Sequence, residues 1–249
     1  VASPNRLKLP NTQTYLPNST NCGGSQTTLS NALRVSCNTA FANVGLEVGQ
    51  EKLREQAQKF GFNARHLNDL NGVASQFPDD MDQAQLALAS IGQYDVAASP
   101  LQMAMVTAGI ANDGAVMDPY VVSMVQGPDL KPLSTTKPAK LSQAMSPANA
   151  KKLQEMMRIV VAQGTGSTAQ LSGVDVGGKT GTAQRGTAKG YKGYITSYVG
   201  FAPLKDPQII TYVVVNNPKK GDPTGTQVAA PVFRDIMQYA LPRYSVAPT

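Results

Sequence analysis

The sequence predicts an α+β fold in which an all-helical lobe comes first and an antiparallel β-sheet flanked by helices follows. Apolar residues recur at helical spacing in the first part of the chain, whereas three segments after residue 173 have the composition of strands. Helices and strands therefore occupy separate parts of the chain instead of alternating, which is typical of this class. The 249 residues suit one domain, with the helical lobe at about 27–115 and the sheet with a final helix at about 116–245.

The helical lobe is predicted from residue 27 onwards. Residues 1–26 are rich in Asn, Thr, Ser, Pro and Gly, and we expect loops with a short strand there. A helical pattern begins at residue 27, pauses at Ser36-Cys37-Asn38 and resumes to about residue 46. Three further helices are predicted, over 50–60, over 82–91 with Asp82 as the N-cap, and from Pro100 to about 112.

The second part of the chain changes character. A strand is predicted over 116–125, then a Pro/Lys/Ser-rich connection over 127–145 and a helix from Ser146-Pro147 to about 162. Three strands separated by Gly, Pro and Asn turns follow, over 174–182, 195–201 and 208–215. Pro231 opens a last helix that ends at about 240.

The net charge of +6 is concentrated in one segment. Between Lys179 and Lys220 the sequence carries seven basic residues and a single acid, and the rest of the chain sums to zero. No module with interleaved aromatic residues and Arg is present, so nucleic acid is not predicted as a partner. Two interpretations remain: a solvated loop edge, or a field that draws an anion towards one site.

The segment Gly173 to Thr180 matches the phosphate-binding pattern G-x-x-x-x-G-K-[ST] by letter. We reject a nucleotide site because a helix must follow that loop, and the glycine-rich residues after Thr180 are poor helix formers. A strand is predicted instead, with Thr180 and Thr182 on one face, Lys179 on the other, and Gly181 allowing a ligand to lie along the backbone. Such an edge suits an extended substrate that ends in a carboxylate, and its N–H groups suit a developing oxyanion.

Two boxes carry a family resemblance. The run Lys179-Thr180-Gly181-Thr182 resembles the KTG box of the penicillin-binding proteins, serine D,D-transpeptidases inhibited by β-lactams, and Ser36-Cys37-Asn38 resembles their S-x-N box. Further segments match the family in the same order over most of the chain, at 89–104, 164–166, 197–203 and 229–233. Within the family, the monofunctional class B enzymes of the actinobacterial penicillin-binding protein A type are the most similar.

The resemblance implies a penicillin-binding transpeptidase fold and a serine acyl-enzyme that cross-links peptidoglycan. It implies that Ser36 relays a proton beside Lys179, that Asn38 holds the substrate amide, and that Thr180 and Thr182 clamp the carboxylate. Without the KTG box, Ser36 and Asn38 would read as helix caps that need no catalysis. The implied partners are the peptidoglycan stem peptide, β-lactams and a membrane glycosyltransferase or scaffold complex. The implied location is the extracytoplasmic face of the bacterial membrane, with the anchor outside this chain and no cofactor.

The family's first box, S-x-x-K, has one literal match, from Ser134 to Lys137. We reject it because Pro138 disfavours a helical conformation at Lys137, so the two side chains would not share a helix face. We expect the nucleophile segment upstream of residue 1. A non-catalytic homologue that senses wall peptide or β-lactam, and a relative that acts as a D,D-carboxypeptidase or β-lactamase, remain as alternatives.

The two cysteines, Cys22 and Cys37, flank the first helix. Because the resembled family is extracytoplasmic, a disulfide between them is expected; in a reducing compartment they would be a free loop cysteine and a buried one. A metal site is not predicted, since the chain has one histidine and no C-x-x-C motif.

Overall fold

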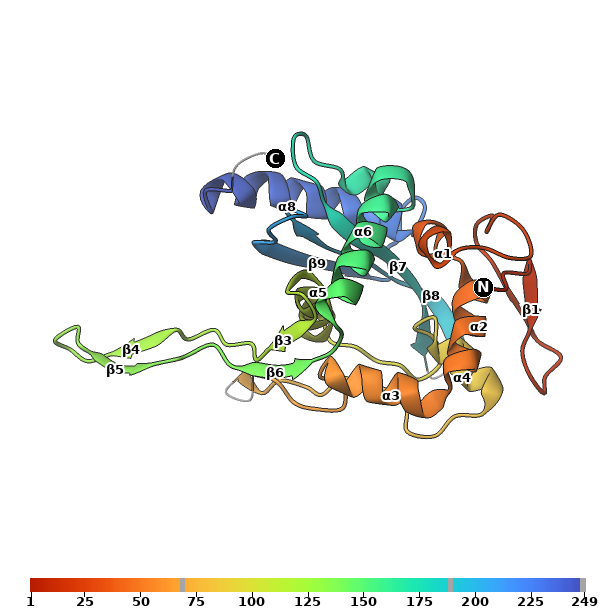
Figure 1. Ribbon diagram of the computed structural model, residues 1–249, viewed down its shortest axis with the longest axis horizontal. Helices are drawn as coiled ribbons and strands as arrows, with labels where there is room; N and C mark the ends of the chain where they lie inside the picture. Colours follow the sequence, from red (N-terminus) through yellow and green to blue (C-terminus); the bar gives the residue numbers. More distant parts are fainter. Residues whose placement is uncertain (68–69, 188–189, 247–249) are drawn as a thin grey trace.

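A computed structural model describes residues 1–67, 70–187 and 190–246. Figure 1 shows the helices of the N-terminal part on one side of a sheet built from the C-terminal part, so the segregated order predicted for an α+β fold is confirmed. The helical lobe contains five helices in the described residues, after a short hairpin of β1 (Arg6–Lys8) and β2 (Tyr15–Pro17): α1 (Leu29–Val35), α2 (Asn38–Val48), α3 (Gln50–Lys59), α4 (Gln83–Ala89) and α5 (Pro100–Ala111).

Helix starts follow the capping residues that the sequence contains. The Asp82 carboxylate accepts from the Gln85 N–H and the Gln85 side chain returns a bond to the Asp82 N–H, which together form a capping box at α4. At α5 the Ser99 hydroxyl alone accepts from the Gln102 N–H, and the proline that follows supplies a preset φ in the first turn. Ser146 likewise caps α6 (Pro147–Gln163) by accepting from the Asn149 N–H, and Pro147 is the first residue of the helix. These predicted starts are confirmed.

The main sheet is antiparallel, with the order β7 (Gly177–Thr187), β8 (Gly190–Ala202) and β9 (Ile209–Asn216). Side chains alternate along β8, so Tyr198 and Phe201 enter cores on opposite faces. The Tyr198 face packs against α8 (Ala230–Arg243), where the ring centroids of Tyr198 and Phe233 lie 4.8 Å apart. The Phe201 face packs against α5 and α6.

The first sheet strand begins later and ends later than the sequence predicts. Leu171 and Val174 form an isolated bridge around Gly173, whose φ is 72°, so the chain turns where the strand was expected to start. Beyond residue 182 the strand continues to Thr187 because β8 pairs with it across the hairpin. Cross-strand pairing therefore overrides the low strand propensity of this glycine-rich stretch. Lys189, one of the seven basic residues, lies outside the described residues.

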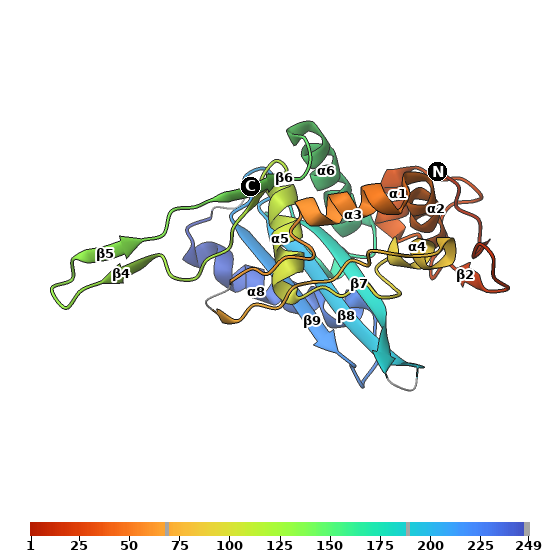
Figure 2. The same cartoon turned by 90° about the horizontal axis from the view of Figure 1, so that it is seen from below.

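The segment after α5 differs from the prediction. Instead of one strand and a connection, it forms β3 (Ala115–Met117), β4 (Met124–Gln126), β5 (Pro132–Thr135) and β6 (Lys140–Gln143), with β3 paired to β6 and β4 to β5. Pro119 has no N–H to donate to a ladder, which accounts for the end of β3. Figures 1 and 2 show β4 and β5 as a narrow ribbon that projects away from the rest of the molecule. We call residues 118–139 the ribbon.

Candidate active site

The Ser36-Cys37-Asn38 turn joins α1 and α2 in the manner that the pause in the helical pattern predicts. Ser36 is the C-cap of α1 and has left-handed backbone angles, φ 58° and ψ 53°. Cys37 is the N-cap of α2, and Asn38 is its first residue. Because the chain changes direction here, Ser36 and Asn38 do not lie on one regular helix, where residues two apart would face nearly opposite ways. Of the alternative cap assignments, the one for Ser36 is correct and the N-cap is Cys37 rather than Asn38.

The ammonium of Lys179 joins this turn to the sheet. Its Nζ donates to Ser36 Oγ at 2.9 Å and to the Thr180 carbonyl at 2.8 Å, and it lies 3.4 Å from Thr180 Oγ1. The side chain is half-buried between the two segments, and this burial lowers the pKa of Lys179 from 10.5 to about 8. At neutral pH the group therefore remains an ammonium, held among hydroxyl and carbonyl oxygens.

Thr180 and Thr182 make different contacts along β7. The Thr180 and Thr165 hydroxyls form a hydrogen bond of 2.9 Å, and Thr182 Oγ1 accepts from the Gly225 N–H at 3.1 Å. Gly225 opens the short helix α7 (Gly225–Val228), which thus contacts the strand at Thr182. Within the described residues β7 is an edge strand, paired only with β8, and Thr182 is exposed. The arrangement leaves an extended edge open to a ligand.

The position of Gly181 has no room for a side chain, for a reason that the sequence did not reveal. An added Cβ would lie 2.4 Å from the Ser197 hydroxyl on β8. The cross-strand neighbour therefore occupies the space of the missing side chain, in addition to any close approach of a ligand along the backbone.

The side chain of Asn38 makes its hydrogen bond elsewhere than the other predicted site residues do. Its Nδ2 donates to the Pro17 carbonyl at the end of β2, at 3.1 Å. The structure thus brings Ser36, Lys179 and Thr180 into one hydrogen-bonded group, with Thr182 two residues along the strand. Only Cys37 separates Asn38 from Ser36, but the Asn38 side chain bonds the N-terminal hairpin instead of this group.

Thr165 is a residue that the sequence reasoning missed. The Gly164-Thr165-Gly166 segment stood out as the lead into the strand, but nothing in it indicated a hydroxyl bonded to Thr180. The Thr226 hydroxyl donates to the Thr165 carbonyl at 2.6 Å, so α7 also supports this loop. An added Cβ at Gly164 would lie 2.3 Å from the Arg34 carbonyl, which accounts for a glycine where the loop passes α1.

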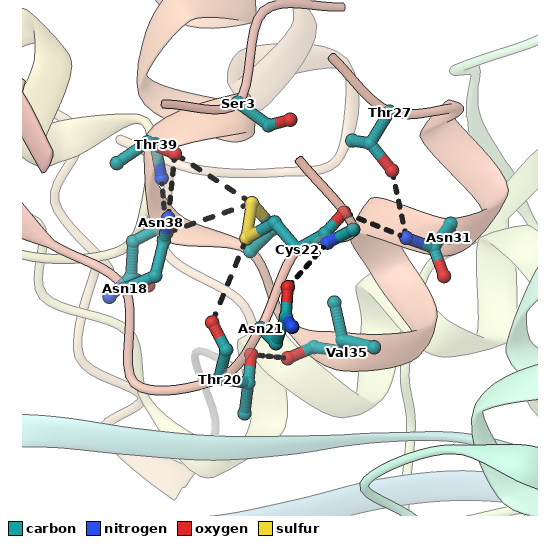
Figure 3. The surroundings of a disulfide bond; sticks show 12 residues. Ser3, Asn18, Thr20, Asn21, Cys22, Thr27, Asn31, Val35, Asn38 and Thr39 are labelled. Atoms are coloured by element: carbon teal, nitrogen blue, oxygen red, sulfur yellow. Dashed lines mark hydrogen bonds between the residues drawn. A yellow bond between two sulfur atoms is a disulfide. The ribbon is translucent and has the colours of Figure 1, made fainter. Parts of the chain in front are cut away.

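A disulfide bond joins Cys22 and Cys37 beside the turn, as Figure 3 shows. Both side chains are buried, at 3% and 0% exposure, so the bond ties a buried point of the turn to the loop that follows β2.

Comparison with known proteins decides the family. A family model described as "Penicillin binding protein transpeptidase domain" matches residues 7–238. This chain belongs to the penicillin-binding protein transpeptidase family. The resemblance carried by the KTG and S-x-N boxes is confirmed.

Curated penicillin-binding relatives support the same assignment. The peptidoglycan D,D-transpeptidase PbpA of Mycolicibacterium smegmatis is 39% identical in an alignment of 248 residues, and the match covers 97% of this chain and 50% of that protein. Stage V sporulation protein D of Bacillus subtilis is 35% identical in an alignment of 219 residues, and the match covers 86% of this chain and 34% of that protein. The chain thus spans about half the length of the mycobacterial relatives that it matches.

A solved structure confirms the penicillin-binding transpeptidase fold. Penicillin-binding protein A from M. tuberculosis, solved as a ceftriaxone acyl-enzyme complex, superimposes with a TM-score of 0.90 at 36% identity. The match covers 96% of this chain and 55% of that one.

Other predicted features can be compared with the part of the chain that the structure describes. Ser134 lies in strand β5 of the ribbon, so it is not on a helix with Lys137, as expected for a chance match to S-x-x-K. Among residues 1–67, 70–187 and 190–246, no cluster of three or more His, Cys, Asp or Glu side chains could hold a metal ion. In the same residues, no helix combines the length and the apolar character needed to cross a bilayer.

Proposed function

We propose that this chain provides the substrate-binding side of a peptidoglycan D,D-transpeptidase that works through a serine acyl-enzyme. The observation that carries the proposal is the ammonium of Lys179, which bonds the Ser36 hydroxyl and lies at the Thr180 hydroxyl on an open strand edge. Membership of the penicillin-binding family supports it, as do relatives that are named peptidoglycan D,D-transpeptidases.

The strand edge is suited to a peptide that ends in D-Ala-D-Ala. The terminal carboxylate would be held by the hydroxyls of Thr180 and Thr182 with the charge of Lys179 close by. The scissile carbonyl would then lie along the strand, where the Thr182 N–H stabilises the developing oxyanion. The Asn38 Nδ2 donates to the Pro17 carbonyl, so Asn38 would hold the substrate amide through its Oδ1, which accepts from the amide N–H.

Ser36 would pass a proton to the leaving nitrogen. Its oxygen accepts from the Lys179 ammonium, so its own O–H is free to point elsewhere. A positive charge at 2.9 Å lowers the cost of an alkoxide-like oxygen at Ser36 while that proton moves. Lys179 thus serves both the relay and the carboxylate clamp.

The nucleophile belongs to an S-x-x-K segment, which we propose lies outside this sequence. Its serine oxygen attacks the carbonyl carbon of the penultimate D-Ala, the C–N bond breaks, and D-Ala leaves with the relayed proton. The amine of a neighbouring stem peptide then attacks the ester and releases the serine, which regains a proton. β-Lactams would acylate the same serine.

The setting follows from the substrate. Peptidoglycan is assembled outside the cytoplasm, so we place this domain at the extracytoplasmic face of the membrane, with an anchor outside this chain. A membrane glycosyltransferase or scaffold complex that delivers new glycan is the expected assembly partner.

Labelling of the full-length protein with a fluorescent penicillin tests the proposal. We expect one covalent adduct, located by intact mass and peptide mapping on a serine of an S-x-x-K box upstream of residue 1. An adduct on Ser134, or no adduct on folded protein, would contradict this mechanism, and the second result would favour a non-catalytic sensor. Rapid release of the adduct by water would instead indicate a carboxypeptidase or β-lactamase.

A further inference from the structure

The loop after β2 holds the Ser36-Cys37-Asn38 turn at several points. The Pro17 carbonyl accepts from the Asn38 amide, and the Thr20 hydroxyl donates to the Val35 carbonyl at 2.6 Å. The Cys22–Cys37 disulfide lies between these contacts. Figure 3 shows the loop residues gathered around the turn. We call residues 17–22 the clasp.

The first N–H groups of α2 need an acceptor that the helix itself does not supply. A helix N-terminus leaves its first amides without intrahelical partners, and the side chain of the N-cap residue ordinarily fills one of them. In α2 the N-cap is Cys37, which makes no side-chain capping bond because its sulfur belongs to the disulfide. Asn18 supplies the missing acceptor from the clasp: its Oδ1 accepts from the Thr39 N–H at 2.9 Å.

Both ends of the Asn18 amide are engaged. Its Nδ2 donates to Thr39 Oγ1 at 2.9 Å and to the Pro4 carbonyl at 3.0 Å. Thr39 is fully buried, at 0% exposure, and its own hydroxyl donates to the same Pro4 carbonyl at 2.8 Å. Asn18 is therefore held in one orientation, and a partly buried network around Thr39 fixes the start of α2.

We propose that Asn18 is a positioning residue for the S-x-N turn. By capping α2 from outside the helix, it fixes the direction in which the backbone leaves Cys37, and hence where Ser36 and Asn38 lie relative to Lys179. The disulfide holds Cys37 only through its side chain, whereas Asn18 bonds the backbone of α2 itself. The inference rests on the proposed function, since it assigns Asn18 to the geometry of that reaction.

Three variants of the full-length protein test the role. Asn18→Ala removes the cap, whereas Asn18→Asp keeps an acceptor for the Thr39 N–H and loses the donors. Asn43→Ala is the matched control: Asn43 also lies on α2 and donates to a carbonyl of the N-terminal segment, that of Ala2 at 3.1 Å, but away from the turn. For each variant, stopped-flow acylation by penicillin separates the dissociation constant of the first complex from the acylation rate constant.

We expect Asn18→Ala to lower the acylation rate constant by about tenfold or more, because catalytic groups are sensitive to displacements near 1 Å. The dissociation constant should change less than about twofold, since the clamp on β7 is untouched. Asn18→Asp and Asn43→Ala should stay within about threefold of the parent rate constant. An unchanged rate constant in Asn18→Ala, or an equal loss in either other variant, would overturn the role of the cap.

Amide hydrogen exchange at residues 37–39 gives a readout that needs no catalysis. Faster exchange in Asn18→Ala, with parental exchange in Asn18→Asp and Asn43→Ala, is expected, and parental exchange in Asn18→Ala would refute the cap. If the parent protein is not acylated at all, the proposed function fails, while exchange still decides whether Asn18 fixes the turn. Should Asn18→Ala not fold, Asn18→Asp alone still tests the cap, because loss of acylation in it would contradict the proposal.

Discussion

At the scale of single residues, Lys179 is held by two opposing effects. Burial favours its neutral form and lowers its pKa to about 8, whereas the Ser36 hydroxyl and the Thr180 carbonyl both accept from the ammonium. The charge therefore survives at neutral pH but is lost within the mildly alkaline range. A relay that depends on the charge should show this loss in its pH dependence.

We expect penicillin acylation of the full-length protein to fall as pH rises through about 8, with the loss of one proton, because Lys179 then becomes neutral. Stopped-flow acylation over neutral to alkaline pH measures this limb. Lys179→Met should be acylated at least about tenfold more slowly and should lack the limb. A limb of the same position and size in Lys179→Met would rule out Lys179 as its source.

The same pKa predicts the opposite trend in stability. Between about 8 and 10.5 the unfolded chain binds more protons at Lys179 than the folded protein does, so the free energy of unfolding should rise with pH across that window. Urea unfolding of the parent protein and Lys179→Met at several pH values isolates this contribution as the difference between them. If the acylation rate falls with pH while the difference in unfolding free energy between parent and variant rises, both effects are assigned to Lys179.

Sequence boxes identified some site residues and missed others for a physical reason. Ser36, Lys179 and Thr180 stand in short ordered motifs, so their chemistry is visible in the letters. Thr165 and Asn18 act through hydrogen bonds to partners 15 and 21 residues away, which depend on how loops pack. No local pattern distinguishes such a threonine or asparagine from a solvated one.

At the scale of elements, the backbone of β7 lies against a buried tyrosine at the residue just before the KTG box. A Cβ added to Gly178 would lie 2.0 Å from the hydroxyl of Tyr198, which is fully buried and packs on Phe233 of α8. Helix α8 is therefore connected to the residue before Lys179 through one aromatic side chain.

We expect Gly178→Ala to destabilise the domain by about 1–3 kcal/mol through overpacking and to slow acylation by displacing Lys179. Gly186→Ala is the matched control on the same strand, because no atom of the described residues lies within 4 Å of its added Cβ. Thermal unfolding and penicillin acylation measure both effects. Tyr198→Phe should partly restore Gly178→Ala, since it removes the clashing oxygen; equal losses in Gly178→Ala and Gly186→Ala would contradict the contact.

Helices were predictable from sequence where capping residues mark them, as at Asp82 and Pro100, because those signals are local. The two strand pairs after α5 were not, because β5 in the ribbon and β6 just after it contain Pro, Lys and Ser in a stretch with no apolar alternation. They are strands because β4 and β3 pair with them, and pairing partners are not encoded in a strand's own letters.

At the scale of the whole molecule, the structure divides the basic segment between two ends of the sheet. Arg185 and Lys192 lie on the β7–β8 hairpin, and Lys219 and Lys220 follow β9 at the same end, where the Asn217 N–H bonds the Tyr194 carbonyl. Lys205 lies between β8 and β9 at the opposite end. These four cations outweigh Asp222, which follows Lys220 by two residues, so this end of the strands that carry the proposed site is net positive; we call it the positive end.

We expect this positive end to speed the capture of anionic β-lactams. The second-order acylation rate constant should fall about threefold between low salt and roughly 0.5 M salt, because screening shortens the reach of the charges. Replacing Lys219 and Lys220 with Gln should flatten this dependence. The control replaces Lys52 and Lys59, exposed on α3, with Gln, which gives the same net charge as the first double variant. If the salt dependence flattens equally in the control, the position of the charges has no role.

The ribbon has a practical consequence for experiments on this domain. Its tip residue Leu130 is 74% exposed, and β4 and β5 pair in a sheet of their own, apart from the strands that carry Lys179. Both cysteines of the chain are taken up by the disulfide, so a cysteine introduced at Leu130 would be the single thiol open to labelling in this chain. A dye or spin label attached there would project from the body of the molecule (Figures 1 and 2), and would report tumbling or tethering of the domain while Ser36, Lys179 and Thr180 stay unmodified.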